Sequence, residues 1–278
     1  GTLTDEALLE QREGNYLAAV FAPGRGADEA GGAQDAGSKP TPDAQVGVAW
    51  TELSSGAFWA MLCPADHLLD ELVRIRPAEV LLPEESRLDT PSFRERLRET
   101  TGASATARPS WAFDADTATA TLCKQFHTAT LEGFGFAGWD TSVSAAGAIV
   151  EYLSETQRTA LEHIRSLRRF DRSDHMGIDG NTLRCLEVHR TLRTNQRAGS
   201  LLHGIDRTCS GLGARLLERW LAFPLTGYSA IVARHDAVEE LSADRDRLGR
   251  LRSELAGVAQ IDRIAAAISM GRVRPREL

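Results

Sequence analysis

The sequence predicts an α/β domain followed by an all-helical domain. Two observations predict this class. Through about residue 173, short apolar runs with the alternation of strands occur between amphipathic helical segments, a mixture typical of a sheet covered by helices. Beyond that point, apolar residues recur only at three- and four-residue spacing, as they do on helices. We therefore expect the domains to cover residues 1–173 and 174–278.

The first domain contains a hairpin signal. Residues 53–56 form a small-residue turn between two apolar segments, and Val46, Val48 and Trp50 would share one face of the first segment. Another apolar segment, which follows Pro77, has the length of a fully buried strand. The predicted strands are residues 16–22, 46–52, 57–62 and 79–82.

Residues 23–44 separate the first two predicted strands and are rich in Gly, Ala, Asp and Pro, without periodicity. That composition predicts a disordered loop. Because long insertions between paired strands cost little stability, we expect the strands on either side to pair around it.

Helices of the first domain are predicted by apolar spacing and by capping residues. Thr90 precedes Pro91, the usual order of a capping hydroxyl and a proline in the first helical turn. Asp116 is expected to cap the next helix. The predicted helices are residues 64–75, a segment from residue 91, residues 116–126 and residues 145–157. The buried side of the first is expected to consist of Leu68, Leu69, Leu72 and Val73.

The segment 199–225 predicts two close-packed helices joined at a corner of small residues. An apolar stretch ends at the polar residues 206–210, and a second helix begins at Gly211 and is ended by Pro224. Because no closing element follows, we expect the helical domain to be severed at the end of the chain. Further helices are predicted at residues 180–192 (after the cap Asp179), at 229–241, and around the apolar rows 248–255 and 261–268.

Charge and cysteine content limit the classes of function. The net charge of −7 is divided unevenly, with −10 on the first 173 residues and +3 on the rest. Stand-alone nucleic-acid-binding domains are usually strongly basic, so neither half fits that class. Four dispersed cysteines without a CxxC pair argue against a zinc site and favour reduced thiols in the cytoplasm. The sequence has no apolar run of membrane-spanning length, and its first residues do not resemble a signal peptide.

Several segments resemble the MutS family of DNA mismatch repair proteins. Residues 199–225 resemble the family pattern GSLL…LD-x-T-x-T-x-x-G-x-R-x-L-x-x-WL-x-x-P, and residues 175–187 resemble M-x-I-D-x-x-T-x-R-N-L-E, with Cys185 where Asn is usual. In the first half, LSSGAF at 53–58 resembles the family's hairpin turn, and RPAEVL at 76–81 resembles the start of one of its strands. The resemblance covers essentially the whole chain apart from the loop after residue 22.

That resemblance implies a connector domain with an RNase H-like α/β fold over residues 1–173, then the first part of the helical core (lever) domain over residues 174–278. It implies a mechanical role, in which this segment couples the family's ATPase to its mismatch-binding and clamp domains. The family's cofactors, ATP and Mg, would bind elsewhere, as would mismatched duplex DNA and a second subunit. Whether this segment is an enzyme by itself stays open, and no membrane partner is expected.

No motif predicts a catalytic, cofactor-binding or metal-binding residue. Gly133, Gly135 and Gly138 satisfy GxGxxG by letters, but no clear strand precedes them and no helix begins at the required place. Residues 32–39 imitate a P-loop with Lys and Ser in the wrong order. Two rivals stay open: a metal-dependent nuclease with an RNase H-like fold, which would need clustered carboxylates, and a free-standing adaptor without an ATPase domain. The candidate carboxylates, scattered along the sequence, are Glu52, Asp114, Asp116 and Asp140.

The helix predicted at residues 116–126 is the best candidate for a partner site. Its outward positions would be small or polar, and in the MutS family this part of the connector is implicated in docking the partner protein MutL. We therefore predict a MutL-docking surface that includes Thr121, Lys124 and Gln125. The alternative is an ordinary solvated helix face.

Overall fold

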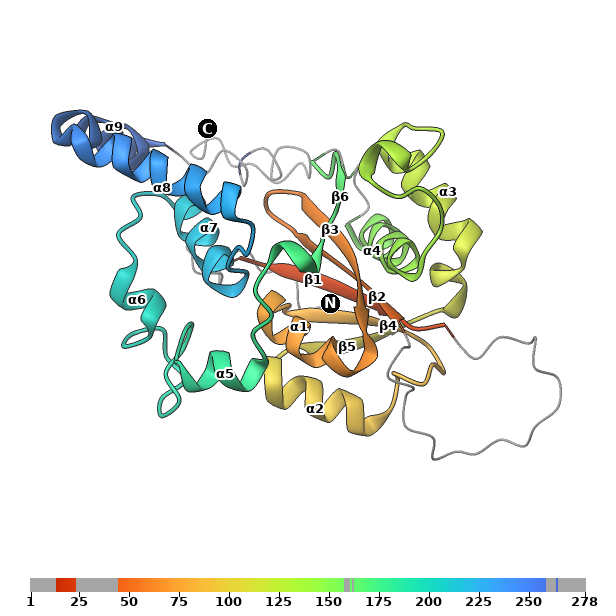
Figure 1. The fold of residues 1–278 in the computed structure, drawn as a ribbon. Helices are drawn as coiled ribbons and strands as arrows, with labels where there is room; N and C mark the ends of the chain where they lie inside the picture. The colour runs from red at the N-terminus through yellow and green to blue at the C-terminus, as the bar shows by residue number, and fades with distance from the viewer. Residues whose placement is uncertain (1–13, 24–44, 158–160, 162, 259–263, 265–278) are drawn as a thin grey trace.

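The computed structural model describes residues 14–23, 45–157, 161, 163–258 and 264. At its centre lies a six-stranded mixed sheet in the order β5-β4-β1-β2-β3-β6 (Figure 1). The strands are β1 (Tyr16–Phe21), β2 (Gln45–Glu52), β3 (Ala57–Pro64), β4 (Glu79–Pro83), β5 (Ser104–Arg108) and β6 (Leu167–Arg169).

The first three strands form an antiparallel meander, and the others extend it in parallel on both sides. β4 pairs with β1 and β5 pairs with β4, whereas β6 pairs with β3 at the opposite edge. Register places Trp50 of β2 opposite Trp59 of β3, and Trp59 opposite Arg168 of β6. These three side chains therefore form one row across the sheet.

Two helical layers cover the sheet, one on each face (Figure 1). α1 (Leu68–Ile75) and α2 (Pro91–Thr101) lie on one face, and α3 (Ala115–Phe126) and α4 (Thr141–Gln157) lie on the other. Val46, Val48 and Trp50 face the α1 side together, as their alternation predicts. On the other face, α4 lies so close to α3 that a Cβ on Gly147 would stand 2.4 Å from the Cβ of Ala118.

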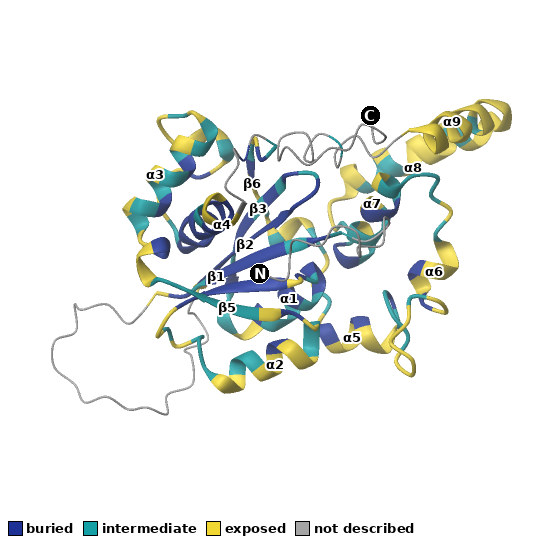
Figure 2. Cartoon of the chain, turned by 180° about the vertical axis from the view of Figure 1, so that it is seen from behind, coloured by how far each residue is buried: buried dark blue, intermediate teal, exposed yellow. Residues whose placement is uncertain are grey.

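The second half of the described chain contains five helices and leaves most of their apolar residues exposed. Figure 2 shows this contrast, with a dark buried sheet beside the largely yellow α8 and α9. α8 and α9 contribute no buried residue, and Leu216 and Trp220 of α7 remain partly exposed. None of the described helices is long and apolar enough to cross a bilayer. The five helices are α5 (Gly180–Cys185), α6 (Leu201–Ile205), α7 (Gly211–Ala222), α8 (Tyr228–Ala243) and α9 (Arg245–Gly257).

The structure confirms the predicted hairpin and most of the predicted elements in the first half. Thr90 caps α2, because its side chain accepts a hydrogen bond from the Phe93 N–H. Several boundaries differ from the predictions. β3 continues to Pro64, so α1 begins only at Leu68; Asp114 rather than Asp116 caps α3; and α4 begins at Thr141, before the predicted residue 145.

In the second half, the turn at 206–210 and the helix that follows it are confirmed, and so is Asp179 as a cap. The helix predicted over residues 180–192 is wrong in length, because α5 ends at Cys185 and Glu187 adopts a left-handed φ of 48°. The helices predicted at 229–241 and around 248–255 are present as α8 and α9, which have no buried residue. The loop predicted at 23–44 and most of the apolar row at 261–268 lie outside the described residues.

Candidate functional site

The end of α7 inserts into the apolar core of the α/β domain. Ala222 and Phe223 are buried in the cluster that fills the sheet face under α1, together with Leu72 and Trp50. Every other member of that cluster comes from residues 16–170. The joint between the sheet-bearing domain and the helices is therefore part of a hydrophobic core, and it is not a flexible link.

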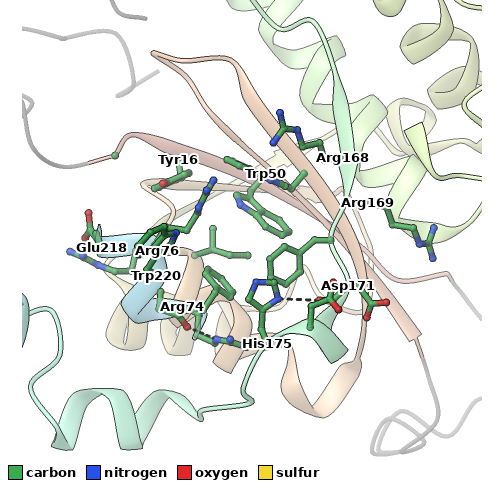
Figure 3. Close-up of a pocket in the computed structure, with 18 of the residues that line it drawn as sticks. Tyr16, Trp50, Arg74, Arg76, Arg168, Arg169, Asp171, His175, Glu218 and Trp220 are labelled. Carbon is green, nitrogen blue, oxygen red and sulfur yellow. Dashed lines mark hydrogen bonds and ion pairs between the residues drawn. The ribbon is translucent and has the colours of Figure 1, made fainter. Parts of the chain in front are cut away.

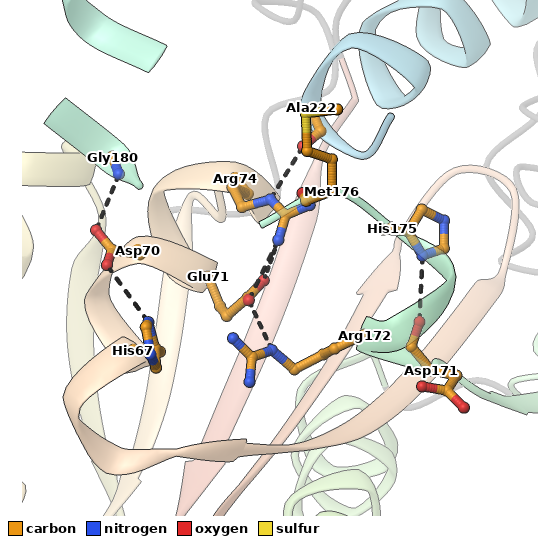
Figure 4. Close-up of polar contacts among 10 residues, drawn as sticks. All are labelled: His67, Asp70, Glu71, Arg74, Asp171, Arg172, His175, Met176, Gly180 and Ala222. Atoms are coloured by element: carbon orange, nitrogen blue, oxygen red, sulfur yellow. Dashed lines mark hydrogen bonds and ion pairs between the residues drawn. The ribbon is translucent and has the colours of Figure 1, made fainter. Parts of the chain in front are cut away.

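Two oppositely charged side chains are buried at this joint. Glu71 and Arg74, one turn apart on α1, form an ion pair at 3.1 Å and keep only 2% and 3% of their side-chain surface exposed. Arg172, which follows β6, donates a second bond from Nε to Glu71 at 2.8 Å. Figure 4 shows the Glu71 carboxylate held between the two guanidinium groups. A buried carboxylate needs such partners, because an unpaired one would be strongly destabilising.

Arg74 also ties α1 to the second half of the chain. Its Nε donates to the Ala222 carbonyl oxygen at 3.0 Å, and a terminal nitrogen donates to the Met176 carbonyl oxygen at 3.0 Å. The Ala222 carbonyl lies in the last turn of α7, where carbonyl groups lack partners within the helix. Burial lowers the pKa of Arg74, and Glu71 opposes that shift. One guanidinium therefore connects α1, the interdomain segment and α7.

Backbone contacts strengthen the same joint. Residues 174–176 run beside residues 224–226: the Met176 N–H donates to the Pro224 carbonyl at 2.7 Å, and the Thr226 N–H donates to the Asp174 carbonyl at 3.0 Å. Between them, His175 and Leu225 form an antiparallel bridge. The chain leaving the sheet and the chain leaving α7 thus hold each other in a strand-like pair.

Aromatic rings line the cavity beside this joint (Figure 3). The Phe170 ring packs edge-on against Trp50 at 5.4 Å and against Phe223 at 5.1 Å, and it stacks on His175 at 4.5 Å. The guanidinium of Arg74 lies 4.4 Å from the centre of the Phe223 ring. Such ring pairs add specific geometry to the area that they bury.

Two further contacts cross between the domains. The Gly180 N–H, at the start of α5, donates to Asp70 of α1 at 2.9 Å. Arg76, which ends α1 in a left-handed conformation, forms an ion pair with Glu218 of α7. His189 lies 3.9 Å from the same Glu218 carboxylate, and its ring nitrogens have no hydrogen-bond partner in the described part of the chain. Burial, followed by the nearby arginines, lowers the pKa of His189 to about 3.

Each carboxylate considered for a nuclease has a different structural role. Glu52 accepts hydrogen bonds from Ser54, Ser55 and the Asn15 N–H, which closes the hairpin turn. Burial raises the pKa of Glu52, but these bonds outweigh it and leave the pKa below its ordinary value. Within the described ranges, no three His, Cys, Asp or Glu side chains come together as a metal site. The other candidates serve as the α3 cap (Asp114), a first-turn acid of α3 (Asp116) and the ion-pair partner of Arg169 (Asp140).

Two sequence motifs look like nucleotide-binding loops by their letters. Gly133, Gly135 and Gly138 lie in a short turn between α3 and α4, so no strand directly precedes them, as the sequence indicates. The P-loop imitation at 32–39 lies outside the described residues.

The predicted docking residues lie on one side of α3, facing a groove toward α4. Thr121, Lys124 and Gln125 line a cavity of about 1080 Å³ with Glu151 and Glu155 of α4. Lys124 is exposed, but the expectation that Gln125 points freely outward is wrong. Its amide nitrogen donates to the carbonyl oxygens of residues 161 and 164 at 2.9 and 3.0 Å, so this side chain anchors a loop. Whether MutL docks here stays a prediction.

Sequence reasoning did not find the joint residues Glu71, Arg74 and Arg172. The sequence did contain one clue. Glu71 and Arg74 lie among the buried apolar residues Leu68 and Leu72 of the amphipathic helix α1. Leu69 and Val73, expected on the buried side, are only half-buried. Only the remote partners at 172, 176 and 222 show that two charges occupy the buried side.

Fold and joint together define a class: a protein in which an α/β domain and a string of helices share one core. Comparison with known proteins identifies the family. The model of MutS domain II matches residues 15–165, and the model of MutS domain III matches residues 181–278. A DNA mismatch repair protein MutS from Rhodopirellula baltica is 45% identical over 280 residues, covering 100% of this chain and 31% of that protein. The chain belongs to the MutS family and spans about a third of the length of this relative.

Proposed function

We propose that this chain acts in mismatch repair as a coupling segment, which links the ATPase of a full-length MutS protein to its mismatch-binding and clamp parts. The observation that carries the proposal is the Arg74 joint. There, one buried side chain of α1 pairs with Glu71 and also binds residue 176 and the end of α7. A movement of α7 would be transmitted to the sheet through this contact, because the two are joined directly and not by a flexible linker. In this proposal, ATP, Mg, mismatched duplex DNA and the second subunit are bound by other domains.

We also infer that the first domain has the RNase H-like fold and serves as a scaffold. The strand order supports this inference, because an antiparallel meander is extended by parallel strands next to β1. Glu52 is hydrogen-bonded in the hairpin turn and Asp114 caps α3. Both contacts support a structural role for these carboxylates and not a nuclease site. Membership of a DNA repair family and four free cysteines are consistent with action in the cytoplasm.

The α3–α4 groove remains our proposed docking surface for MutL. Thr121 and Lys124 would contact the partner directly, and Gln125 would hold the groove in shape through its bonds to residues 161 and 164. The cavity contains both signs of charge, Lys124 and Arg165 against Glu151 and Glu155, which suits a polar partner surface.

Coupling can be tested with Arg74→Met in the full-length protein. We expect the basal ATP turnover to persist and its response to mismatched DNA to fall about tenfold, the size of an ordinary coupling energy. Arg96→Met, an exposed α2 position, is the matched control and should behave as the wild type. An unchanged mismatch response in a folded Arg74→Met protein would contradict the proposal.

Docking can be tested with Lys124→Glu, measured as MutL recruitment to mismatched DNA. We expect recruitment to weaken about tenfold or more while DNA binding by the variant stays unchanged. Asp116→Lys, at the other end of the same helix, is the control for a general charge effect. Intact recruitment by Lys124→Glu would remove α3 from the MutL interface.

A further inference from the structure

A cavity of about 410 Å³ lies at the seam of the two domains, beside the joint described above (Figure 3). Its walls come from the sheet, from α1, and from α7 and α8. Three arginines in its lining belong to three different elements: Arg168 to β6, Arg219 to α7 and Arg234 to α8. The cavity is therefore lined by positive groups from both halves of the chain.

These three arginines differ from the other arginines in the lining. Arg74, Arg76 and Arg169 are neutralised by the carboxylates of Glu71, Glu218 and Asp140. Across the described residues, Arg168, Arg219 and Arg234 form no ion pair with a carboxylate. Asp171 and Asp174 also line the cavity, so these three guanidinium groups stand against two carboxylates and leave a small surplus of positive charge, within a domain pair whose net charge is negative.

Aromatic rings hold two of these guanidinium groups in place. Arg219 lies 5.3 Å from the centre of the Trp59 ring, and Arg234 lies 3.7 Å from that of Trp220. Arg168 is the registered neighbour of Trp59 across the sheet. Stacking uses the flat face of a guanidinium and leaves its N–H edge available, and that edge binds an oxyanion through two parallel hydrogen bonds.

The positive groups also repel one another. Burial and the charge of Arg219 both lower the pKa of Arg234. An anion between them would relieve this repulsion, since opposite charge favours the ionised form.

We propose that this cavity binds a small phosphate-bearing ligand, which Arg168, Arg219 and Arg234 grip from both domains. The volume lies within the range of small-molecule sites. Three separate guanidinium forks match a multiply charged phosphate better than a single carboxylate, which one fork satisfies. A long nucleic acid is disfavoured, because Asp171, Asp174 and Glu218 also line the cavity.

Binding would have a mechanical consequence. The ligand would cross-link β6 to α7 and α8, and so add a second connection beside Arg74 between the sheet and the helices. The site follows from the cavity and its charges, and it would stand even if the coupling role in mismatch repair were wrong.

The probe for this site is inorganic pyrophosphate added to the 278-residue chain. Trp50, Trp59 and Trp220 line the cavity, so tryptophan fluorescence reports occupancy. We expect a saturable fluorescence change and a rise in Tm of several degrees, neither of which sodium chloride produces at the same ionic strength. Equal effects of pyrophosphate and chloride would overturn the proposal.

Variants assign the effect to the named residues. Arg219→Gln and Arg234→Gln should each weaken pyrophosphate binding at least tenfold, and Arg250→Gln on the exposed α9 should leave it unchanged. Arg234→Lys keeps the charge without the fork, so it should fold and bind with intermediate affinity. Wild-type binding by folded Arg219→Gln and Arg234→Gln variants would overturn the proposal. A short poly-glutamate peptide that binds these arginines more tightly than pyrophosphate would also overturn it, in favour of an acidic peptide ligand.

Discussion

Arg74 Nε lies 3.0 Å from the carbonyl oxygen of Ala222, although 148 positions separate the two residues in the sequence. The contact joins a helix that covers the sheet to the end of a helix in the second half. It is buried, charged on one side and supported by Glu71 and Arg172. Such a contact stabilises the fold only while each buried polar group keeps its partners.

Replacement of Arg74 should therefore destabilise the whole chain. Arg74→Met would leave the carbonyl groups of residues 176 and 222 without their donor and would leave Glu71 with only Arg172 among the arginines of the joint. We expect a loss of about 3–5 kcal/mol in the free energy of unfolding, because a partner of a buried ion pair is removed. Urea unfolding measures it, and Arg96→Met should change stability by less than about 0.5 kcal/mol. A loss as small as that of the control would show that the joint is not energetically important.

The contact between α3 and α4 should be intolerant of a single methyl group. Gly147→Ala would place a Cβ 2.4 Å from the Cβ of Ala118, so one helix must shift. We expect a destabilisation of about 1–3 kcal/mol by overpacking. Gly249→Ala in α9, where no atom lies within 4 Å of the new Cβ, should instead stabilise by about 0.5–1 kcal/mol. Thermal unfolding of the pair compares them, and similar changes in Tm would contradict the close packing.

His189 should make stability depend on pH. In the folded chain its pKa is lowered to about 3, whereas the ordinary value is 6.5. The unfolded chain therefore takes up a proton as the pH falls through 6.5, and the folded chain does not take it up until about pH 3. Stability should decrease across this window by up to about 1.4 kcal/mol per pH unit.

The matched measurement uses His189→Gln, followed by urea midpoints between pH 7 and pH 4. This variant should lose part of the pH dependence, whereas the exposed His203→Gln should keep all of it. Identical slopes for His189→Gln and the wild type would mean that His189 has the same pKa in the folded and unfolded chains, which would contradict the lowered pKa.

Local sequence patterns predict the strands that contain many buried apolar residues. Strands β1 to β4 contain mostly buried side chains, so their apolar runs are visible in the sequence. Strands β5 and β6 were not predicted, because they are edge strands with few buried residues, and β6 contains only Leu167, Arg168 and Arg169. Edge strands are defined by pairing with a distant neighbour, which local spacing does not encode.

The joint was hidden for a related reason. Glu71 and Arg74 have the composition of a solvated helix face, and they are buried only because Arg172, residue 176 and residue 222 arrive from far along the chain. Gln125 shows the converse: a polar residue expected at a partner surface instead donates hydrogen bonds within the domain, to the carbonyl oxygens of residues 161 and 164. In both cases the long-range partner decides the role of the side chain.

The most direct test of the coupling account is differential scanning calorimetry of the wild-type chain and of Arg74→Met. If the sheet and the end of α7 share one core, the wild type should unfold in a single transition whose calorimetric and van't Hoff enthalpies agree. Arg74→Met should keep one transition at a clearly lower Tm, because Ala222 and Phe223 still belong to the shared core. Two separate transitions in the wild type, unaffected by the substitution, would contradict the account.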